Sequence, residues 1–412
     1  MSKKYSVFIT ALFCAFLGAF FVANAATPDK DFSPVENRAL AQAPALSTQS
    51  LLSGDFMADF EEYVTDQFVL RDRWIALKAG AEYASGKREN NGIYICDQHT
   101  LIPRFDAPTD DRGAQRCDKN FALVDTFAGL TDVPVYFSLI PGKVSVWSHL
   151  LPEGAPNGDE GVYLARGAQS GAHWLDVSTA LTAHKDEPIY YRTDHHWTSL
   201  GAYYAYAALM EGMGLEPKAL GDFTPTVASE EFYGTAFSSS GVRWMAPDTM
   251  EFYVPQDAAQ VTNYFDQTPT PGQLYDLAKL EEKDKYSAFL GGNKPLTVLK
   301  SNVADPGAPR LLVVRDSFSD SIAPFLCYNF SEVHLVDPRY YKTSTAQYVK
   351  DNAIDQVLIL YSVDNFVKES SLFVQGLPAK KERDEKPPPF PWEQRRFFIP
   401  LPFSGERRTR GR

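Results

Sequence analysis

Cysteine and net positive charge are the two things that this sequence has little of. Four of its 412 residues are cysteine, and their spacing fits no zinc site. The chain holds 40 Lys and Arg against 52 Asp and Glu, a formal net charge of -12. Because nucleic-acid phosphates repel an acidic protein, this balance argues against a nucleic-acid partner. A hydrophobic content of 44% and a charged content of 22% exclude wholesale disorder.

The cysteines outside the amino-terminal apolar run offer one pairing. Cys96 and Cys117 flank a segment rich in Asp, Arg and Pro, and we expect a disulfide between them. On the loop-entropy model, a bridge that closes a segment of this length stabilises the fold by about 3 kcal/mol. Cys327 would remain unpaired, as a small buried apolar side chain.

The amino terminus has the pattern of an export signal. Lys3 and Lys4 precede an uncharged apolar run over residues 5–22, and Ala23-Asn24-Ala25 supplies a small-residue cleavage pattern. The run is also nearly long enough to span a bilayer, so residues 1–25 are either a cleaved signal peptide or a membrane anchor. In both cases the rest of the chain is expected to work outside the cytoplasm, secreted or associated with the cell envelope.

The rest of the chain divides into an extended segment, one large domain and a tail. Residues 26–50 are polar and read as extended, whereas residues 51–375 alternate helical and strand-like patterns. Residues 376–412 are basic and rich in proline, and this composition predicts a disordered tail. A basic tail could also contact an anionic polymer or lipid at the cell surface.

The pattern within the large domain predicts an α/β fold. Helices are expected over residues 51–86, with a break near Arg71-Asp72, and over residues 198–213. Several short apolar runs are continuous rather than alternating, which is typical of strands buried on both faces of a mostly parallel sheet. These strand candidates are residues 92–95, 134–140, 189–191, 311–314, 333–336 and 357–361. No secondary structure is assigned over residues 222–285.

Two motifs carry the residue types of nucleophilic acyl chemistry. Asp194-His195-His196-Trp197 supplies an acid and imidazoles, and Ser317 follows an apolar strand candidate within Arg315-Asp316-Ser317-Phe318. On an extended segment, residues two apart share a face, so Asp194 and His196 would point one way and His195 the other. Asp194 could then orient His196, whose second nitrogen takes a proton from Ser317, while Trp197 walls the site.

Other readings of the same residues stay open. The histidine pair could lie in a surface loop or bind a metal, but adjacent histidines on a strand diverge and no third His or Cys lies near, so we predict neither metal nor cofactor. Ser317 could cap a helix over residues 321–326, which is compatible with a nucleophile beside helix amino-terminal N–H groups. Ser319 and Ser321 are rival hydroxyls farther from the strand end.

Two glycine-containing segments are candidate binding loops. In residues 289–293, paired glycines before Asn293 allow close backbone approach to a ligand, and the amide of Asn293 is a neutral donor. Residues 140–143 end the strongest early strand candidate and form a similar loop. Either segment could equally be a plain turn.

These motifs resemble those of a known family. The segment Tyr191-Arg192-Thr193-Asp194-His195-His196-Trp197-Thr198 is similar to the signature of the bacterial DHHW proteins, and to the Asp-x-His-Trp motif of the alginate O-acetyltransferases. The resemblance extends over most of residues 35–366. Its supporting segments are Glu36-Asn37-Arg38, Asp66-Gln67-Phe68, Asn91-Gly92-Ile93-Tyr94, Asp284-Lys285-Tyr286, Gly291-Gly292-Asn293 and Asp337-Pro338-Arg339-Tyr340-Tyr341.

The resemblance implies an SGNH-hydrolase-like three-layer fold with flanking helices and a permuted motif order, in which Asp and His precede Ser. It implies Ser317 as nucleophile, His196 as base and Asp194 as the residue that orients it, with oxyanion donors from Gly292 and Asn293. Arg315-Asp316-Ser317-Phe318 departs from the usual Gly-Asp-Ser, so the backbone around the serine is expected to differ.

The function that the resemblance implies is O-acetylation of a cell-envelope polysaccharide or exopolysaccharide through an acetyl-serine intermediate. A membrane-bound O-acyltransferase would be the partner that delivers the acetyl group. Trp197 with Tyr191 could form a platform for a sugar ring, or both side chains could simply belong to the core. The alternatives are a carbohydrate acetyl esterase with the same three residues, and a binding or scaffold protein that has lost the chemistry. A binding protein has no need of all three residues.

Overall fold

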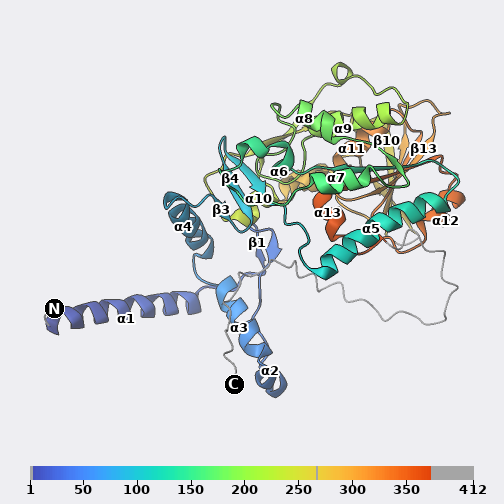
Figure 1. The fold of residues 1–412 in the computed structure, drawn as a ribbon. Coiled ribbons are helices and arrows are strands. Elements are labelled where there is room, and N and C mark those ends of the chain that lie inside the picture. The colour runs from blue at the N-terminus through green and yellow to red at the C-terminus, as the bar shows by residue number, and fades with distance from the viewer. Residues whose placement is uncertain (1–2, 266–267, 373–412) are drawn as a thin grey trace, which may run out of the picture. The chain divides into compact units, whose positions relative to one another are not determined.

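A mixed sheet forms the centre of the molecule. The computed structural model describes residues 3–265 and 268–372, and its largest sheet has eight strands in the order β11-β10-β12-β14-β13-β15-β6-β7 (Figure 1). The pairings from β14 through β13, β15 and β6 to β7 are parallel, and those from β11 to β14 are antiparallel. The strands are β6 (Val135–Ile140), β7 (His173–Trp174), β10 (Ala259–Tyr264), β11 (Pro269–Gly272), β12 (Leu296–Ser301), β13 (Arg310–Arg315), β14 (Glu332–Val336) and β15 (Gln356–Ser362).

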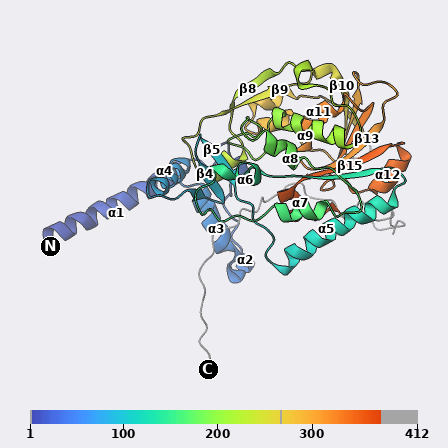
Figure 2. The same cartoon turned by 45° about the horizontal axis from the view of Figure 1, so that its top comes forward.

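Continuous apolar sequence explains the central strands. Residues 311–314 of β13 are completely buried, as are residues 357 and 358 of β15, because helices cover both faces of the sheet. Figures 1 and 2 show α8, α9 and α11 on one face and α5, α7, α12 and α13 on the other. The helices are α5 (Asp111–Leu130), α7 (Gly161–Gly167), α8 (Ser178–Ala183), α9 (Ser199–Gly212), α11 (Ser319–Leu326), α12 (Thr345–Asp351) and α13 (Val363–Lys368). The predicted α/β class with a largely parallel sheet and flanking helices is confirmed.

Smaller elements surround this core. A three-stranded antiparallel sheet and a two-stranded one flank it, and short helices join the segments. These are β3 (Glu89–Asn90), β4 (Ile93–Cys96), β5 (Thr100–Pro103), β8 (Thr226–Phe232), β9 (Asp248–Phe252), α6 (Lys143–Val146), α10 (Thr235–Ser240), and 3-10 turns at Ser148–Leu150, Leu220–Asp222, Gln256–Ala258, Leu277–Glu281 and Lys285–Ala288. Residues 222–285, which carried no prediction, therefore contain four strands and α10.

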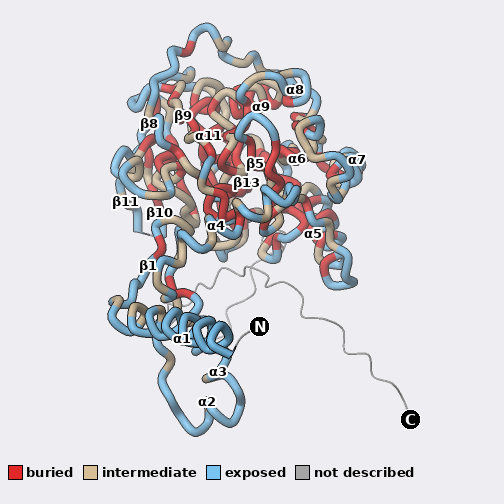
Figure 3. The backbone as a smooth tube through the Cα atoms, turned by 90° about the vertical axis from the view of Figure 1, so that its left-hand side faces the viewer, coloured by how far each residue is buried: buried red, intermediate tan, exposed pale blue. Residues whose placement is uncertain are grey.

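The amino-terminal residues are helical and mostly exposed, as the pale tube of Figure 3 shows along α1 and α2. The elements are α1 (Lys3–Ala26), β1 (Phe32–Ser33), β2 (Arg38–Ala39), α2 (Thr48–Ser53), α3 (Asp55–Asp66) and α4 (Arg71–Ala84). Among the described residues, α1 is the helix that is long and apolar enough to cross a membrane, which suits a signal peptide and an anchor alike. The segment expected to be extended includes β1, β2 and α2, and the predicted tail at 376–412 lies outside the described residues.

The disulfide prediction is corrected, because the structure has Cys96 and Cys117 as free, buried thiols. The chain between them is not an irregular loop: it forms β5 and the start of α5. Each thiol packs in the main apolar core as a small hydrophobic side chain, and burial raises the pKa of Cys96 to about 12. Cys327 is buried as predicted.

The strand predicted at residues 189–191 is also corrected. It does not join the main sheet; Tyr190 forms a single bridge with Trp197, so residues 190–197 fold back on themselves as a loop. The N–H of Tyr191 donates to the carbonyl of His196 at 3.2 Å, and the N–H of Thr198 donates to that of Ile189 at 2.9 Å. A closed loop satisfies its polar backbone locally, which a strand would do through the sheet.

Gly201 provides a test of how tightly this loop packs on α9. A Cβ at position 201 would lie 2.1 Å from the carbonyl oxygen of Ile189, whereas one at Gly129, on α5, would meet nothing within 4 Å. We expect Gly201→Ala to lower the free energy of unfolding by about 1–3 kcal/mol through overpacking. Gly129→Ala is the matched control and should leave it unchanged or slightly raised, because Ala favours a helix. Equal thermal melting shifts in the two variants would contradict this packing.

Candidate active site

The candidate site lies where the parallel strands end. β6, β13 and β15 finish side by side, and the segments that follow them carry Lys143, Ser317 and Asn365. Ligand sites of open α/β sheets lie outside this carboxyl edge, because the loops there converge. The loop over residues 190–197 reaches the same edge from a distant part of the chain.

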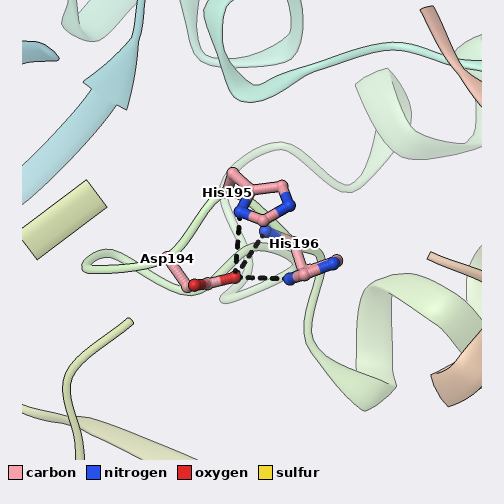
Figure 4. A group of neighbouring side chains, drawn as sticks. All are labelled: Asp194, His195 and His196. Carbon is pink, nitrogen blue, oxygen red and sulfur yellow. Dashed lines mark hydrogen bonds and ion pairs between the residues drawn. The ribbon is translucent and has the colours of Figure 1, made fainter. Parts of the chain in front are cut away.

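Asp194, His196 and Ser317 form one chain of hydrogen bonds. The Nδ1 atom of His196 lies 2.6 Å from Oδ1 of Asp194, and its Nε2 atom lies 2.8 Å from Oγ of Ser317. Figure 4 shows the two histidines and the aspartate meeting within the single loop. Since an ionised carboxylate only accepts, Nδ1 of His196 donates to it, which leaves Nε2 free to accept from the serine hydroxyl. The predicted pairing of these residues is thus present in the geometry.

Asp194 is buried yet surrounded by donors. Only 1% of it is exposed, and its two oxygens accept from the N–H of His196 at 2.9 Å, from the N–H of Thr235 at 2.7 Å and from the Thr235 hydroxyl at 3.0 Å. Burial favours the neutral acid, but the two histidines and these hydrogen bonds outweigh it and hold the pKa of Asp194 well below its usual value. Gly234 makes room for this carboxylate, because a Cβ there would lie 2.2 Å from its Oδ2 atom.

A second carboxylate and a lysine hold the loop from outside. Asp248, at the start of β9, accepts from the N–H groups of Arg192 at 2.9 Å and Thr193 at 2.8 Å. Lys143 is 2% exposed, and its Nζ atom donates to the carbonyls of Leu101, Tyr191 and Arg192. Burial lowers the pKa of Lys143 to about 8. The predicted loop at residues 140–143 therefore supports the site.

The turn that carries Ser317 depends on Asp316. One oxygen of Asp316 accepts from the N–H of Phe318 at 3.1 Å. The other accepts from the N–H and hydroxyl of Ser362, at 2.9 and 2.7 Å, and from Nδ2 of Asn365 at 2.8 Å. This carboxylate ties the end of β13 to the end of β15 and fixes the serine between strand and helix. Helix α11 begins at Ser319, two residues before the predicted start.

The rival hydroxyls are engaged or buried elsewhere. Ser319 is completely buried, and its hydroxyl has no hydrogen-bond partner among the described residues. The Ser321 hydroxyl lies 2.8 Å from Nε1 of Trp197 and 3.0 Å from the hydroxyl of Tyr286. Of the three serines, Ser317 is the one that contacts His196.

Aromatic side chains enclose His196. The Tyr286 ring stacks on the imidazole with 3.7 Å between centroids, and the Phe318 ring lies 4.9 Å away. Trp197 and Tyr191, expected as a platform for a sugar, are instead core residues with 0% and 1% exposure. Trp197 fixes the loop to α11 by donating to the carbonyl of Phe318 at 3.0 Å. A completely buried ring offers no face to a ligand, so the platform prediction is corrected.

The Gly291-Gly292-Asn293 segment makes hydrogen bonds to Phe289 and Arg315 rather than to Ser317. The N–H of Gly292 donates to the carbonyl of Phe289 at 3.1 Å, and the side-chain oxygen of Asn293 accepts from Arg315. No hydrogen bond between the described residues joins Gly292 or Asn293 to Ser317. Their oxyanion role, which came from the resemblance, stays a prediction.

His195 lies beside the other two polar side chains rather than opposite them. Its ring centroid is 3.8 Å from that of His196, and its Nδ1 atom is 3.6 Å from Oδ1 of Asp194. The expectation that the adjacent histidines diverge is wrong, because the segment is a tight loop and not a strand. Asp194, His195 and His196 offer ligand atoms within 4.8 Å of one another, so they have the residue types and spacing of a candidate metal group. Both nitrogens of His196 already make hydrogen bonds to protein, an arrangement suited to proton transfer.

A cavity of about 310 Å³ opens next to these residues. His195, Phe318 and Thr235 line one part of its wall, and residues from β4, β5, α6 and the start of α13 line the rest. Glu160 contributes a buried carboxyl that accepts from the N–H of Gly142 at 2.8 Å and from the Ser145 hydroxyl at 2.6 Å. Burial outweighs these bonds and raises the pKa of Glu160 to about 7.

Several residues of the site were not predicted from the sequence. They are Thr235, Asp248, Asp316 as a turn-fixing carboxylate, Tyr286 and Glu160. Tyr286 was named within the family resemblance but received no role, and Asp316 was visible next to the serine. Thr235, Asp248 and Glu160 lie in stretches with no motif, so their positions depend on tertiary contacts alone.

The fold and these side chains define a mixed α/β protein with a serine, histidine and aspartate joined at its carboxyl edge. The sequence model of the DHHW protein family matches residues 172–336, a span that contains both motifs. The predicted resemblance to the DHHW family is therefore confirmed. No curated protein sequence matches the chain.

The chain is also similar in fold to solved structures. A DHHW family protein from Eubacterium siraeum is 25% identical with a TM-score of 0.59, and the match covers 69% of this chain and 95% of that one. PatB1 of Bacillus cereus, solved with a sulfonyl adduct, is 22% identical with a TM-score of 0.55, over 68% of this chain and 97% of that one. The O-acetyltransferase domain of AlgJ from Pseudomonas putida is 17% identical with a TM-score of 0.43, over 68% and 93%.

The pH dependence of stability tests the burial of Glu160. Its pKa is raised in the folded protein, so its contribution to stability is fully present below about 4.5 and is lost as the pH rises to about 7. Glu160→Gln, which stays neutral, should thus gain free energy of unfolding relative to the wild type between pH 4.5 and 7.5, by at most about 3 kcal/mol. Denaturant titrations at several pH values measure the difference.

The exposed Glu153 provides the control, and Glu153→Gln should follow the wild type across this range. A difference between Glu160→Gln and wild type that does not change with pH would show that Glu160 is solvated in the folded protein.

Proposed function

We propose that this protein is an extracytoplasmic O-acetyltransferase that acts on a cell-envelope polysaccharide or exopolysaccharide, with Ser317 as nucleophile. The hydrogen-bonded chain Asp194–His196–Ser317 at the edge of a cavity carries the proposal. A serine is a weak nucleophile until a base accepts its proton, and the base needs a group that fixes its tautomer. Both requirements are met by the contacts of His196.

The first half of the proposed reaction forms an acetyl-serine. Nε2 of His196 takes the proton from Ser317 as Oγ attacks the carbonyl carbon of the acetyl donor. The resulting imidazolium lies against Asp194, whose ionised carboxylate stabilises it. As the tetrahedral intermediate collapses, His196 returns the proton to the leaving group, and the acetyl group remains on Oγ as an ester.

The second half transfers the acetyl group to a sugar hydroxyl. His196 removes the proton of that hydroxyl as its oxygen attacks the acetyl-serine, and the proton then returns to Oγ of Ser317. No net charge or electron is exchanged, so no redox cofactor is required. The order of Asp and His before Ser along the chain agrees with a permuted SGNH-hydrolase-like arrangement.

The location of the donor follows from the amino terminus. A signal peptide or an anchor at residues 1–25 would place the domain outside the cytoplasm. A membrane-bound O-acyltransferase is therefore the proposed partner, which would bring the acetyl group across the membrane. The apolar, exposed α1 supports this location because it has the length and composition for the membrane.

Hydrolysis by the same residues is the second candidate. His195 is 36% exposed at the side chain and lines the cavity, so water can reach the neighbourhood of His196. An esterase would use water in place of the sugar hydroxyl with an unchanged first half. A scaffold without chemistry is disfavoured, because a binding protein gains nothing from a buried Asp–His pair aimed at a serine.

Substitutions of Ser317, His196 and Asp194 test their proposed roles. We expect Ser317→Ala and His196→Ala to reduce turnover of an activated acetyl ester by roughly three orders of magnitude or more, with the fold intact by circular dichroism. Asp194→Asn should cost less, because the base and the nucleophile themselves remain. Ser319→Ala is the matched control and should retain most activity. If Ser317→Ala keeps near-full turnover, another nucleophile or a metal mechanism operates.

The fate of the acetyl group separates transfer from hydrolysis. Purified protein is given an activated acetyl ester with and without envelope oligosaccharides, and acetylated sugar and free acetate are quantified by mass spectrometry. A transferase should form acetylated sugar at the expense of free acetate. Acetate release at an unchanged rate, with no acetylated sugar from any glycan offered, would instead identify an esterase.

A further inference from the structure

His195 is the polar side chain of the Asp-His-His-Trp motif that the proposed reaction does not use. Its neighbour His196 makes both contacts of the proton relay, and His195 touches neither Ser317 nor any residue of its turn through a polar contact in the described part of the chain. It is nonetheless 36% exposed at the side chain and lines the cavity beside the site. A half-buried imidazole that reaches the cavity needs a separate explanation.

The hydrogen bonds of Thr235 fix which nitrogen of His195 carries the proton. Oδ2 of Asp194 can only accept, so the hydroxyl of Thr235, 3.0 Å away, donates to it. The single hydroxyl proton of Thr235 is then in use, and its oxygen must accept at its other contact. That contact is Nδ1 of His195 at 2.6 Å, so Nδ1 bears the proton.

The opposite nitrogen of His195 is consequently an acceptor. In a neutral imidazole with a protonated Nδ1 atom, Nε2 carries the lone pair. Figure 4 shows the second nitrogen of His195 turned away from Asp194. Burial and the neighbouring His196 lower the pKa of His195, which agrees with this neutral form.

The charged groups of the cavity wall favour an uncharged ligand. Its two cationic side chains are already engaged: Lys143 donates to three backbone carbonyls, and Arg104 contacts Asp106 at 2.7 Å. Glu160 and Asp364 present carboxyl groups to the same space, and Asp364 is paired with Lys368 at 2.6 Å. A ligand carboxylate would therefore lose its water without gaining a free cation, whereas hydroxyl groups can donate to these oxygens and to Nε2.

We propose that His195 binds the acetyl acceptor: Nε2 of His195 accepts a hydrogen bond from one hydroxyl group of an uncharged sugar, while the neighbouring hydroxyl is presented to His196. This inference rests on the proposed transferase function and adds the substrate class, a neutral glycan rather than one of uronic acids. The imidazole centroids of the two histidines are 3.8 Å apart, so a ligand held at His195 lies next to His196. His195 touches the acceptor without exchanging a proton with it.

His195→Asn isolates this role. The Asn side-chain amide can still donate to Thr235 in place of Nδ1, but it lacks the acceptor at Nε2. Formation of acetyl-serine from an activated acetyl ester is measured by mass spectrometry of the intact full-length protein, and transfer is measured with neutral and with uronic-acid oligosaccharides. We expect transfer to the neutral sugar to fall at least tenfold more than acetyl-serine formation, with a raised KM for the sugar.

Two further variants provide a control and a partial rescue. His149→Asn changes an exposed histidine outside the site and should match the wild type in both measurements. His195→Gln carries an amide oxygen that can reach the Nε2 position, so it should recover part of the transfer lost in His195→Asn. It also provides a second measurement if the Asn variant does not fold.

Other outcomes would refute the role of His195, the substrate class or the proposed function. Transfer and acetyl-serine formation that fall in parallel in both His195 variants, or transfer that does not change, would refute the role of His195. Faster wild-type transfer to uronic-acid oligosaccharides than to neutral ones would refute the substrate class. A wild-type protein that forms no acetyl-serine would refute the proposed function itself, a failure that is visible before any sugar is added.

Discussion

Asp194 keeps its negative charge in a position that water hardly reaches, and the arrangement of the site follows from how that charge is satisfied. Its oxygens accept from the backbone and ring of His196 on one side and from the backbone and hydroxyl of Thr235 on the other. Leaving such a carboxylate without partners would cost several kcal/mol, so the groups that surround it are held in place. The missing side chain of Gly234 is part of the same constraint.

The carboxylate of Asp194 determines the tautomers of both neighbouring histidines. Through His196 it sets the tautomer that faces Ser317, and through Thr235 it sets the tautomer of His195 that faces the cavity. One buried charge therefore orders the hydrogen bonds that lead to Ser317 and those that orient His195 at the cavity. Two further carboxylates hold the surrounding backbone in the same way. Asp248 accepts from backbone N–H groups of the loop at residues 190–197, and Asp316, next to Ser317, accepts from the backbone N–H of Ser362.

Much of the fold could be predicted from the sequence, because continuous apolar runs identify strands buried on both faces. The strands at residues 135–140, 310–315, 332–336 and 356–362 and helix α9 agree closely with the patterns. The strand predicted at residues 189–191 was wrong, since an apolar triplet is as suited to a packed loop as to a strand. Residues 222–285 gave no pattern because their strands are short, lie near the edges of sheets and carry many polar residues.

The candidate site divides in the same way. Asp194, His196 and Ser317 are recognisable by residue type and order, and their contact agrees with the expected pairing. Trp197 and Tyr191 could not be placed, since an aromatic side chain that packs and one that binds look the same in sequence. The disulfide at Cys96 and Cys117 failed for a related reason: spacing along the chain does not reveal that the intervening residues form regular structure. Thr235, Asp248 and Glu160 contribute through contacts that no local motif encodes.

His196 and Ser317 are 121 residues apart in the chain, and this separation has a consequence for folding. Their hydrogen bond requires β13 to lie between β14 and β15 and the loop at residues 190–197 to dock on α11, so it depends on long-range contacts that form slowly. Chain entropy opposes that contact until the sheet is assembled. A nascent or partly folded chain thus lacks the hydrogen bond between His196 and Ser317, which can form only once the sheet and the loop are in place.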